Sequence, residues 1–585
     1  MVLHNTRDAS VPPVAGMTGT ATPVWFGAPE RPLSGWVHMP QGNVARGGAV
    51  LCAPLAREQD IARYTFRRLA EELSARGVIT LCFDYDGTGD SAGDDEDPGR
   101  VAAWLRSVDQ AAEFLRHCGA TSVTLIGMRA GALLAASAAR TAHAAGLVLW
   151  DPCKSGRSFV REQHALHRLQ FGPSVVMDGQ IEIPGFVLSA ETAADIGWLE
   201  PDIIGSPVQR TLILTRGEQP TPAPLAEHLA GREVEFEEAN GQELLLEGSG
   251  ANQEIPLAAI ERIATWVADA LPPEGSPVQL DATITKFVGR HDGEEIVEWA
   301  RRIGPSQLFG IETHHARRSV GPTIIFINTA YGTHVGLNRL WVDLARRWAA
   351  AGLRCFRLDL SGLGDSPSRP GHPEHVVRSP VAFDDLFDVT QALCPEDPTN
   401  VVFIGLCAGG YQALEAAVAV GAKGVCVVNP VLRFRPPELG DGPIDPRRRL
   451  CRPTTNVSRV ARRLPDVPLL SRTRMRTWRE VGFSGSLKAQ PSWVQELVDS
   501  GVETLCICGE DEANAIEVEM STADHHDGFE VQLVPELDHA LLPAHQRVEV
   551  IARLTDHVLT HFARRPITSR AVSPREHSTS ATRPA

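Results

Sequence analysis

A cysteine flanked by glycines is the residue of this chain best suited to nucleophilic chemistry. In residues 401–411 an apolar run reaches Gly405, and Cys407 and then Gly409-Gly410 follow before a helical pattern begins. This spacing predicts a sharp strand-to-helix turn with Cys407 at its tip, because small residues on both sides let the backbone bend tightly. The amino end of the following helix favours a thiolate. Cys407 is therefore predicted to attack acyl groups.

The elements that must position Cys407 occur twice in the chain. Residues 78–91 and 353–366 each form a strand that ends in Asp-x-x-Gly-x-Gly-Asp-Ser, and the two copies are offset by 275 positions. Around each copy, apolar runs and helical patterns alternate in the same order, which predicts parallel sheets built from strand–helix–strand units. Within the second turn, Asp365 is expected to brace the loop by hydrogen bonding rather than to take part in chemistry.

An offset of this length indicates two full domains rather than a solenoid. We place the first domain at 23–272 and the second at 278–565, with a proline-rich linker at 272–277. The tails, 1–22 and 566–585, are rich in Thr, Ser, Pro and Ala without periodicity, and we expect them to be disordered.

Composition narrows the class of protein. The chain has 585 residues, 43% of them hydrophobic, and a net charge of −16, which argues against general nucleic-acid binding. No apolar run approaches the roughly 18–20 residues that span a bilayer, and the start of the chain lacks a signal-peptide pattern. Eleven cysteines without a CxxC pair indicate free thiols in a reducing cytoplasm. We predict neither a metal nor a cofactor, and the oligomeric state stays open.

Both halves resemble the α/β-hydrolase superfamily, specifically its serine-aminopeptidase-like branch. The resemblance rests on the Gly-x-Gly-Asp-Ser turn followed at the right distance by an elbow, twice. It implies two tandem α/β-hydrolase domains with mostly parallel, doubly wound sheets, each with a helical cap insert. The six residues Gly-x-Cys-x-Gly-Gly are also similar to the box of polyhydroxyalkanoate synthases and dienelactone hydrolases, which implies that cysteine can serve this fold in acyl transfer or lactone opening.

The resemblance implies an acid and a base for Cys407, since these enzymes carry nucleophile, acid and histidine in that order. The acid follows the next-to-last strand, and Asp511 is our choice over its neighbours Glu510 and Glu512. The histidine lies in the loop after the last strand, which makes His539 the base. The acid would fix the imidazole tautomer and stabilise the imidazolium.

Two further parts of the site follow from the same order of elements. The oxyanion would be stabilised by the backbone amide of Ala408 and by that of Thr329 or Ala330, in the loop after the strand predicted at 323–328. Two other histidines, His525 and His526, precede the last strand in a polar loop, and we interpret them as part of a solvated turn.

The first half keeps the frame of an elbow without its chemistry. Arg129 stands where the nucleophile is expected, and an arginine cannot be deprotonated to attack a carbonyl. Glu218 is a candidate remnant of the acid, and no histidine follows the last strand. Such arginine elbows are similar to those of hydrolase-like proteins of exosortase systems. We predict a non-catalytic domain that serves as a scaffold, with binding of a carboxylate or phosphate by Arg129 as the alternative.

A basic segment is expected to cap the second domain. Residues 431–480 contain 13 arginines, no lysine and five acidic residues, and Arg474 and Arg476 belong to its densest cluster. Arginine without lysine favours bidentate recognition of phosphate or carboxylate, although a solvated helical surface is the simpler interpretation. We therefore expect an anionic acyl donor, either a coenzyme A thioester or an acyl group on an acidic carrier protein.

Three functions are consistent with these residues. The first is a cysteine-dependent acyltransferase or thioesterase, possible in secondary metabolism, because a thioester intermediate is readily attacked by amines, alcohols and thiols. The second is a hydrolase of carboxylic esters or lactones. The third is a binding or scaffolding protein in which both halves have lost activity, which requires an inert Cys407.

Overall fold

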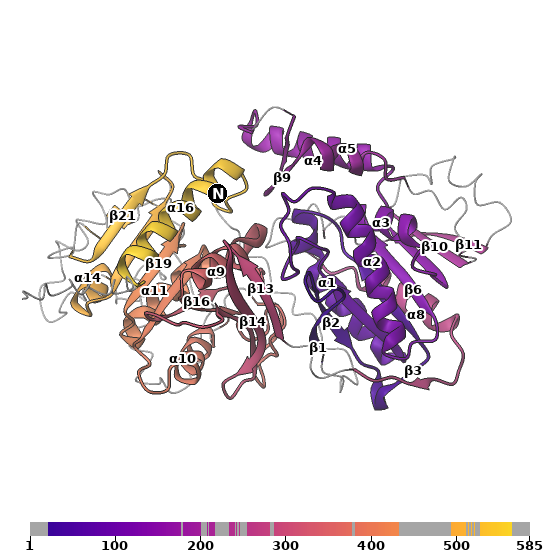
Figure 1. The fold of residues 1–585 in the computed structure, drawn as a ribbon, viewed down its shortest axis with the longest axis horizontal. Helices are drawn as coiled ribbons and strands as arrows, with labels where there is room; N and C mark the ends of the chain where they lie inside the picture. The colour runs from indigo at the N-terminus through magenta and orange to yellow at the C-terminus, as the bar shows by residue number, and fades with distance from the viewer. Residues whose placement is uncertain are drawn as a thin grey trace, which may run out of the picture.

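The fold is described from a computed structural model. It describes residues 21–176, 179–200, 208, 210–216, 233–239, 242, 245, 254–280, 286–376, 379, 381–431, 493–510, 513, 516–517, 520 and 527–563. Two α/β halves lie side by side, the first in indigo to magenta and the second in red to yellow (Figure 1).

The first half is built on an eight-stranded sheet with the order β1-β2-β5-β4-β6-β7-β10-β11. The contacts of β2 with β1 and β5 are antiparallel, and the strands from β5 to β11 run parallel. The strands are β1 (Thr22–Phe26), β2 (Leu33–His38), β4 (Gly47–Cys52), β5 (Val78–Phe83), β6 (Val123–Met128), β7 (Gly146–Trp150), β10 (Arg210–Thr215) and β11 (Glu233–Glu238).

The second half repeats this order and adds one strand at the edge, giving β13-β14-β15-β17-β16-β18-β19-β20-β21. Its strands are β13 (Lys286–His291), β14 (Glu294–Ile303), β15 (Leu308–His315), β16 (Thr323–Ile327), β17 (Arg354–Leu358), β18 (Val401–Leu406), β19 (Gly424–Val428), β20 (Glu503–Cys508) and β21 (Phe529–Leu533). Two mostly parallel sheets of the same order confirm the predicted fold class and the internal repeat.

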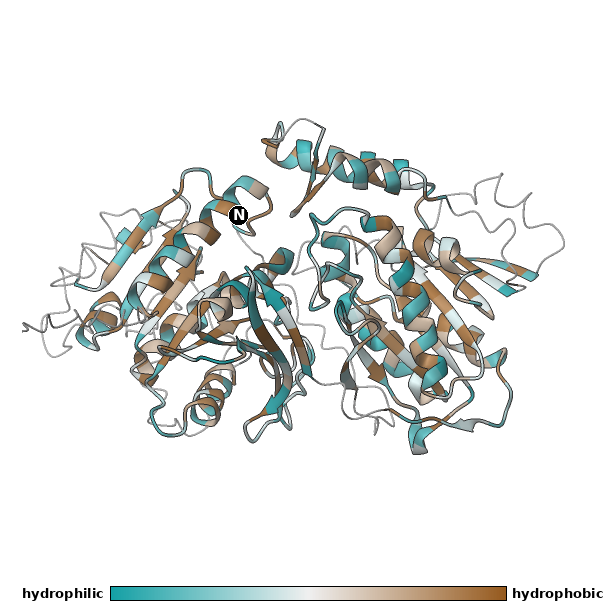
Figure 2. Cartoon of the chain, viewed as in Figure 1, coloured by the Kyte–Doolittle hydropathy of each residue, from teal (hydrophilic) through white to brown (hydrophobic). Residues whose placement is uncertain are grey.

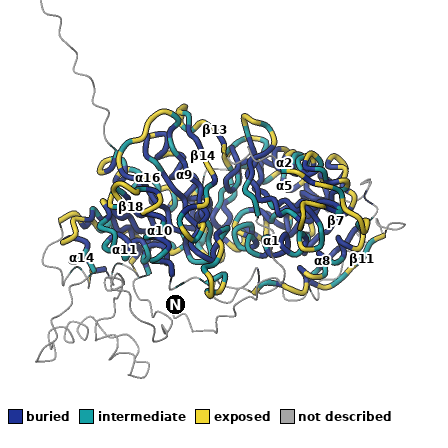
Figure 3. The backbone as a smooth tube through the Cα atoms, turned by 90° about the horizontal axis from the view of Figure 1, so that it is seen from below, coloured by how far each residue is buried: buried dark blue, intermediate teal, exposed yellow. Residues whose placement is uncertain are grey.

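Helices cover both faces of each sheet, because strands such as β6 and β18 are apolar and buried on both sides. Figures 2 and 3 show these apolar, buried strands at the centre of each half. The main helices are α1 (Arg57–Ala75), α2 (Arg100–His117), α3 (Ala130–Ala138), α8 (Leu257–Asp269), α9 (Leu340–Ala350), α10 (Ala382–Leu393), α11 (Ala408–Val420), α14 (Trp493–Asp499) and α16 (Ala544–His561).

The first half carries the predicted insert between β7 and β10. It consists of α4 (Gly156–Phe171), the hairpin β8 (Ile181–Ile183) and β9 (Phe186–Leu188), and α5 (Ala190–Ile196). In Figure 1 this insert lies above the remainder of the molecule. The corresponding arginine-rich segment of the second half, with Arg474 and Arg476, lies outside the described residues.

The two halves share an apolar cluster at their junction. Trp36 on β2 packs edge-on against Phe309 on β15, with ring centroids 4.6 Å apart, and the cluster also includes Trp25, Ala92, Phe287, Ala300 and Ile311. The connecting segment stays against the first half, where β12 (Ser276–Pro277) pairs with β3 (Val44–Ala45) and Val278 is buried in the first core. Among the described helices, none combines the length and the apolar character that a membrane span requires.

Candidate active site

The predicted strand-to-helix turn is present at Cys407. Cys407 has φ 57° and ψ −120°, its backbone N–H donates to the carbonyl of Val428 (3.0 Å), and α11 begins at the next residue. A Cβ added to Gly405 would lie 2.3 Å from the carbonyl oxygen of Gly409, and one added to Gly409 would lie 2.7 Å from that of Asn328. Neither position therefore tolerates a side chain, and the half-buried Cys407 is held at the tip of a tight bend.

The loop predicted to complete the oxyanion site packs directly behind this bend. Thr329 and Ala330 follow β16, and the loop closes through a hydrogen bond from the N–H of Gly332 to the carbonyl of Thr329 (2.5 Å). Ala330 has a positive φ of 38°, so the backbone turns sharply here. Ala408 is the first residue of α11, where backbone N–H groups have no partner within the helix. The geometry brings the loop and Ala408 together, and their role as oxyanion donors stays a prediction.

The loop that carries His539 reaches the same edge of the sheet. His539 is exposed and lies between β21 and α16, in a turn organised by Asp538. The carboxylate of Asp538 accepts hydrogen bonds from the N–H groups of Ala540 (3.1 Å) and Leu542 (3.0 Å). The backbone of the predicted base is therefore fixed by a local turn.

Asn429, which the sequence interpretation did not single out, links the parts of this site. It is fully buried directly after β19, and its amide donates to the carbonyls of Asp538 (3.1 Å) and His539 (3.4 Å). Its side-chain oxygen accepts from the N–H of Gly509 (3.0 Å), two residues before the predicted acid Asp511. One side chain thus ties the histidine loop and the start of the acid loop to the strand next to the elbow.

The internal repeat could have identified Asn429. The two elbow residues, Arg129 and Cys407, are 278 positions apart, and so are Asp151 and Asn429. Asp151 and Asn429 both follow a central strand with a positive φ, 45° and 43°. Several other residues considered from the sequence lie outside the described part of the chain: Glu218, Asp511, Glu512, His525 and His526.

The elbow of the first half has the same backbone and a different environment. Arg129 has φ 55° and ψ −122°, is buried, and is paired with Glu58 (3.3 Å), Glu162 (2.8 Å) and Asp151 (3.8 Å). Burial opposes the charge of Arg129, but these carboxylates outweigh it and raise its pKa. An anionic ligand at Arg129 would be repelled by these three carboxylates. The arrangement therefore favours a structural role of Arg129 over anion binding.

The repeated Gly-x-Gly-Asp-Ser turns form the polar centre of the junction between the halves. His334 is buried between Asp90 of the first half and Asp359 of the second, at 2.7 Å from each. Burial lowers the pKa of His334, but the charges of Asp359 and Asp90 outweigh it and raise the pKa to about 10. His334 is therefore a cation that holds the two turns together.

The prediction that Asp365 braces its turn by hydrogen bonding is wrong, because Asp359 and Ser366 make the hydrogen bonds of this turn. The carboxylate of Asp359 accepts from the N–H groups of His334 (2.6 Å) and Asp365 (2.9 Å), and the Ser366 hydroxyl donates to the Asp359 carbonyl (2.6 Å). Oδ2 of Asp365 is buried and has no hydrogen-bond partner among the described residues. In the described part of the chain, two groups of side chains could hold a metal ion. The first consists of His334, Asp359 and Asp365, but His334 is already engaged in ion pairs. The second consists of Glu503, His557 and His561, from β20 and α16.

The comparisons with known proteins agree with this topology. Residues 324–554 match the model of the alpha/beta hydrolase family. The second half belongs to the α/β-hydrolase superfamily. Its strand order is repeated in the first half, so the chain has the fold of a hydrolase-type enzyme twice. No curated protein matches the sequence significantly.

Solved α/β-hydrolase structures match about half of the chain. A dienelactone hydrolase from Anabaena variabilis is 13% identical and covers 46% of this chain and 98% of its own, with a TM-score of 0.29. Est1E from Butyrivibrio proteoclasticus is 12% identical over 42% of this chain and 98% of its own (TM-score 0.33). The serine hydrolase XC6422 from Xanthomonas campestris is 14% identical over 46% of this chain and 96% of its own (TM-score 0.28).

Proposed function

We propose that the second hydrolase domain is a cysteine-dependent acyl-transfer enzyme, an acyltransferase or a thioesterase, with Cys407 as nucleophile. The observation that supports this most is the hydrogen-bonding of Asn429, which holds the loop of His539 and the start of the acid loop beside the elbow. Cys407 is half-buried at the tip of the strained turn, which is the position of the nucleophile in an elbow of this type. Since Asp511 lies outside the described residues, its role rests on its position in the sequence.

The proposed reaction has two steps. Sγ of Cys407 attacks the substrate carbonyl, His539 takes the thiol proton, and the bond to the leaving group breaks as that group receives the proton. An acceptor, either water or another nucleophile, then attacks the thioester, gives its proton to His539 and releases Cys407. The N–H groups of Ala408 and of Thr329 or Ala330 stabilise the oxyanion in both steps.

Product analysis distinguishes the two enzymatic functions. The wild-type protein is supplied with a thioester or an ester, with water alone or with an added amine or alcohol, and the products are quantified. Transfer predicts that the acylated acceptor forms at the expense of free acid, whereas an ester or lactone hydrolase gives acid alone. The Cys407→Ala variant must lose both products, and Cys394→Ala, which removes another half-buried thiol, must keep them. Equal turnover by Cys407→Ala would exclude the proposed nucleophile.

We further propose that the first half is a scaffold that supports two loops of the catalytic half. Tyr64 on α1 stacks on His375 (ring centroids 4.1 Å apart), which stacks on Tyr331 (4.3 Å) in the predicted oxyanion loop. At the hairpin of the insert, the buried carboxylate of Glu182 accepts from the N–H of Ala544 (2.7 Å), at the start of α16. The first half thus contacts the segments on both sides of the elbow.

The acyl donor is proposed to be anionic, a coenzyme A thioester or an acyl carrier protein, because of the excess of eight positive charges over residues 431–480. Electrostatic steering by these arginines predicts that kcat/KM falls as the salt concentration rises from about 20 to 300 mM. A neutral ester serves as the control substrate, since its kcat/KM should not change. A salt-independent kcat/KM for the anionic donor would refute the steering.

A further inference from the structure

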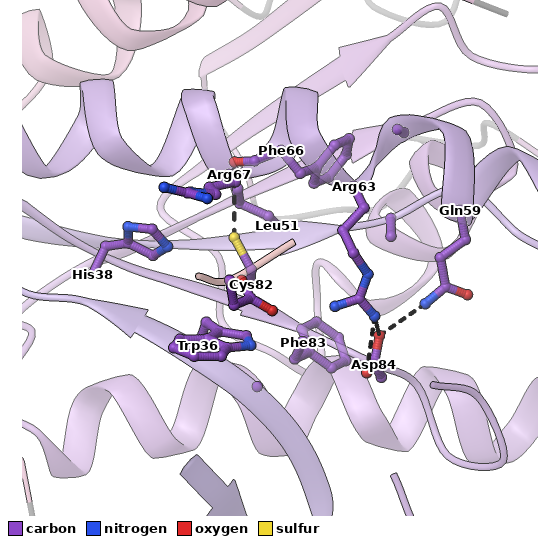
Figure 4. Close-up of a pocket in the computed structure, with 14 residues that line it drawn as sticks. Trp36, His38, Leu51, Gln59, Arg63, Phe66, Arg67, Cys82, Phe83 and Asp84 are labelled. Atoms are coloured by element: carbon purple, nitrogen blue, oxygen red, sulfur yellow. Dashed lines mark hydrogen bonds and ion pairs between the residues drawn. The ribbon is translucent and has the colours of Figure 1, made fainter. Parts of the chain in front are cut away.

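A small cavity lies where the first sheet meets the Gly-x-Gly-Asp-Ser turn of the second half (Figure 4). Its volume is about 50 Å³, several times what one water molecule needs. Trp36, Phe66, Cys82 and His38 line it from the first half, and Asp365 lines it from the second. None of the residues proposed for catalysis contributes to its wall, so this cavity is separate from the elbow.

The internal repeat shows what occupies the same place in the second half. In the first sheet Cys82 is paired with Leu51, and in the second sheet Arg357 is paired with Phe326. Both partners of the second pair lie 275 positions after those of the first. Cys82 and Arg357 therefore have the same position in their sheets, one with a short thiol and the other with a long cationic side chain.

Arg357 crosses the junction and binds the aspartate of the opposite turn. Its guanidinium is fully buried and is paired with Asp90 of the first half and with Glu298 (3.1 Å). The aspartate 275 positions after Asp90 is Asp365. Asp365 therefore faces Cys82 as Asp90 faces Arg357, but no guanidinium extends from position 82 to meet it.

The polar atoms of the cavity reflect this missing side chain. Oδ2 of Asp365 is buried without a hydrogen-bond partner among the described residues. The thiol of Cys82 points elsewhere and contacts the carbonyl of Phe66 (3.8 Å). Burial lowers the pKa of His38 to about 3, so its imidazole is neutral and one ring nitrogen can accept a hydrogen bond. The ring of Trp36 also lines the cavity, and the guanidinium of Arg302 already lies 5.9 Å from its centroid, so this ring accepts a planar cation beside it.

The two arginines in the wall do not call for an anionic ligand. Arg63 is already paired with the carboxylate of Asp84 (3.0 Å), as Figure 4 shows. Arg67 is paired with Glu71 (3.0 Å) and donates to the carbonyl of Gly364 (2.6 Å). Their charges are compensated within the protein. Asp365 lies in the electrostatic field of both arginines and of His334, but its Oδ2 accepts no hydrogen bond from a described residue.

We propose that this cavity binds the guanidinium or amidinium group of a small ligand. The bound group takes the place of the guanidinium of Arg357 in the other half: its N–H groups donate to the carboxylate of Asp365 and to His38, and its plane lies against Trp36. The site is independent of the acyl chemistry proposed for Cys407, and it would make the junction between the halves sensitive to a small cationic metabolite.

Three small probes of similar size and different charge test the proposal on the full-length protein at pH 8. Methylguanidinium is the cation, methylurea its neutral analogue and acetate an anion, and the methyl protons of each report binding by saturation-transfer NMR. Methylguanidinium should bind with a Kd in the millimolar range, as expected for about five heavy atoms. At ten times the Kd it should raise Tm by about 3 °C over matched sodium chloride. Methylurea and acetate should do neither.

Variants locate the site. Asp365→Asn should weaken methylguanidinium binding at least tenfold, whereas Asp397→Asn, at an exposed position, should leave it unchanged. If Asp365→Asn does not fold, Cys82→Arg decides the question, because it supplies the guanidinium from the chain and should raise Tm and abolish binding. Binding of methylurea or acetate as strong as that of methylguanidinium, or methylguanidinium binding retained by a folded Asp365→Asn or Cys82→Arg protein, would overturn the proposal.

Discussion

Replacing Asn429 by alanine should damage stability and catalysis together. The substitution removes three hydrogen bonds, to the N–H of Gly509 and to the carbonyls of Asp538 and His539. Each leaves a backbone group without its partner at about 1–2 kcal/mol. Alanine also tolerates the positive φ of 43° less well than asparagine does. Together these effects should lower the free energy of unfolding of the second half by about 3–5 kcal/mol, equivalent to about 6–15 °C in Tm.

The catalytic loss follows from the freed histidine loop. A displacement of His539 by about 1 Å costs on the order of 100-fold in rate, so kcat/KM should fall by about that factor at a temperature where the variant is folded. Asn429→Asp keeps the acceptor for Gly509 and the left-handed backbone but loses both donors, so its loss should be intermediate.

Thermal denaturation and steady-state kinetics on the same preparations measure both effects. Asn400→Ala is the matched control, because this asparagine lies at the other end of the parallel strands and its side chain makes no hydrogen bond with a described residue. The reasoning fails if Asn429→Ala retains kcat/KM within about threefold of the wild type.

Two other predictions concern contacts between the two halves. His334 has a folded pKa of about 10 against an unfolded value near 6.5, so its contribution to stability should be complete below about pH 6.5 and be lost as the pH rises towards 10. Glutamine is the residue at the equivalent position of the first half, Gln59. The variant His334→Gln should therefore show a smaller decrease of Tm between pH 7 and 10 than the wild type. An unchanged slope of Tm against pH would contradict the ion-pair account. Tyr64→Ala should lower kcat/KM about three- to tenfold by removing the support of Tyr331, while Tyr64→Phe, which keeps the ring, should stay within twofold; equal effects of the two variants would exclude support by stacking.

The fold could be predicted because the signals for it are local and occur twice. Apolar runs and the Asp-x-x-Gly-x-Gly-Asp-Ser pattern mark where strands end, and both copies form the same hydrogen bonds: Ser91 donates to the Asp84 carbonyl and Ser366 to that of Asp359, each at 2.6 Å. The elbow was equally visible, because glycines at both sides of Cys407 are required by close backbone contacts that no other residue permits.

Contacts across the junction could not be predicted in the same way. Nothing in the local sequence of Arg357 shows that it extends from a buried strand to Asp90, 267 residues earlier. The local sequence around Asn429 indicates only the end of a strand, because the loops of Asp538 and Gly509 that it binds are distant in the sequence. The expected bracing by Asp365 was wrong for a related reason, since the carboxylate of Asp359, six residues earlier, accepts the hydrogen bonds from the backbone N–H groups of His334 and Asp365.

The central claim is that Cys407 forms a covalent acyl intermediate. Full-length protein is mixed with an activated acyl thioester, quenched in acid, and analysed by intact mass and peptide mapping. We predict one acyl group per chain, located on Cys407, retained in Cys394→Ala and absent from Cys407→Ala. No adduct on Cys407 in the folded protein, or an adduct of equal yield in Cys407→Ala, would contradict the account.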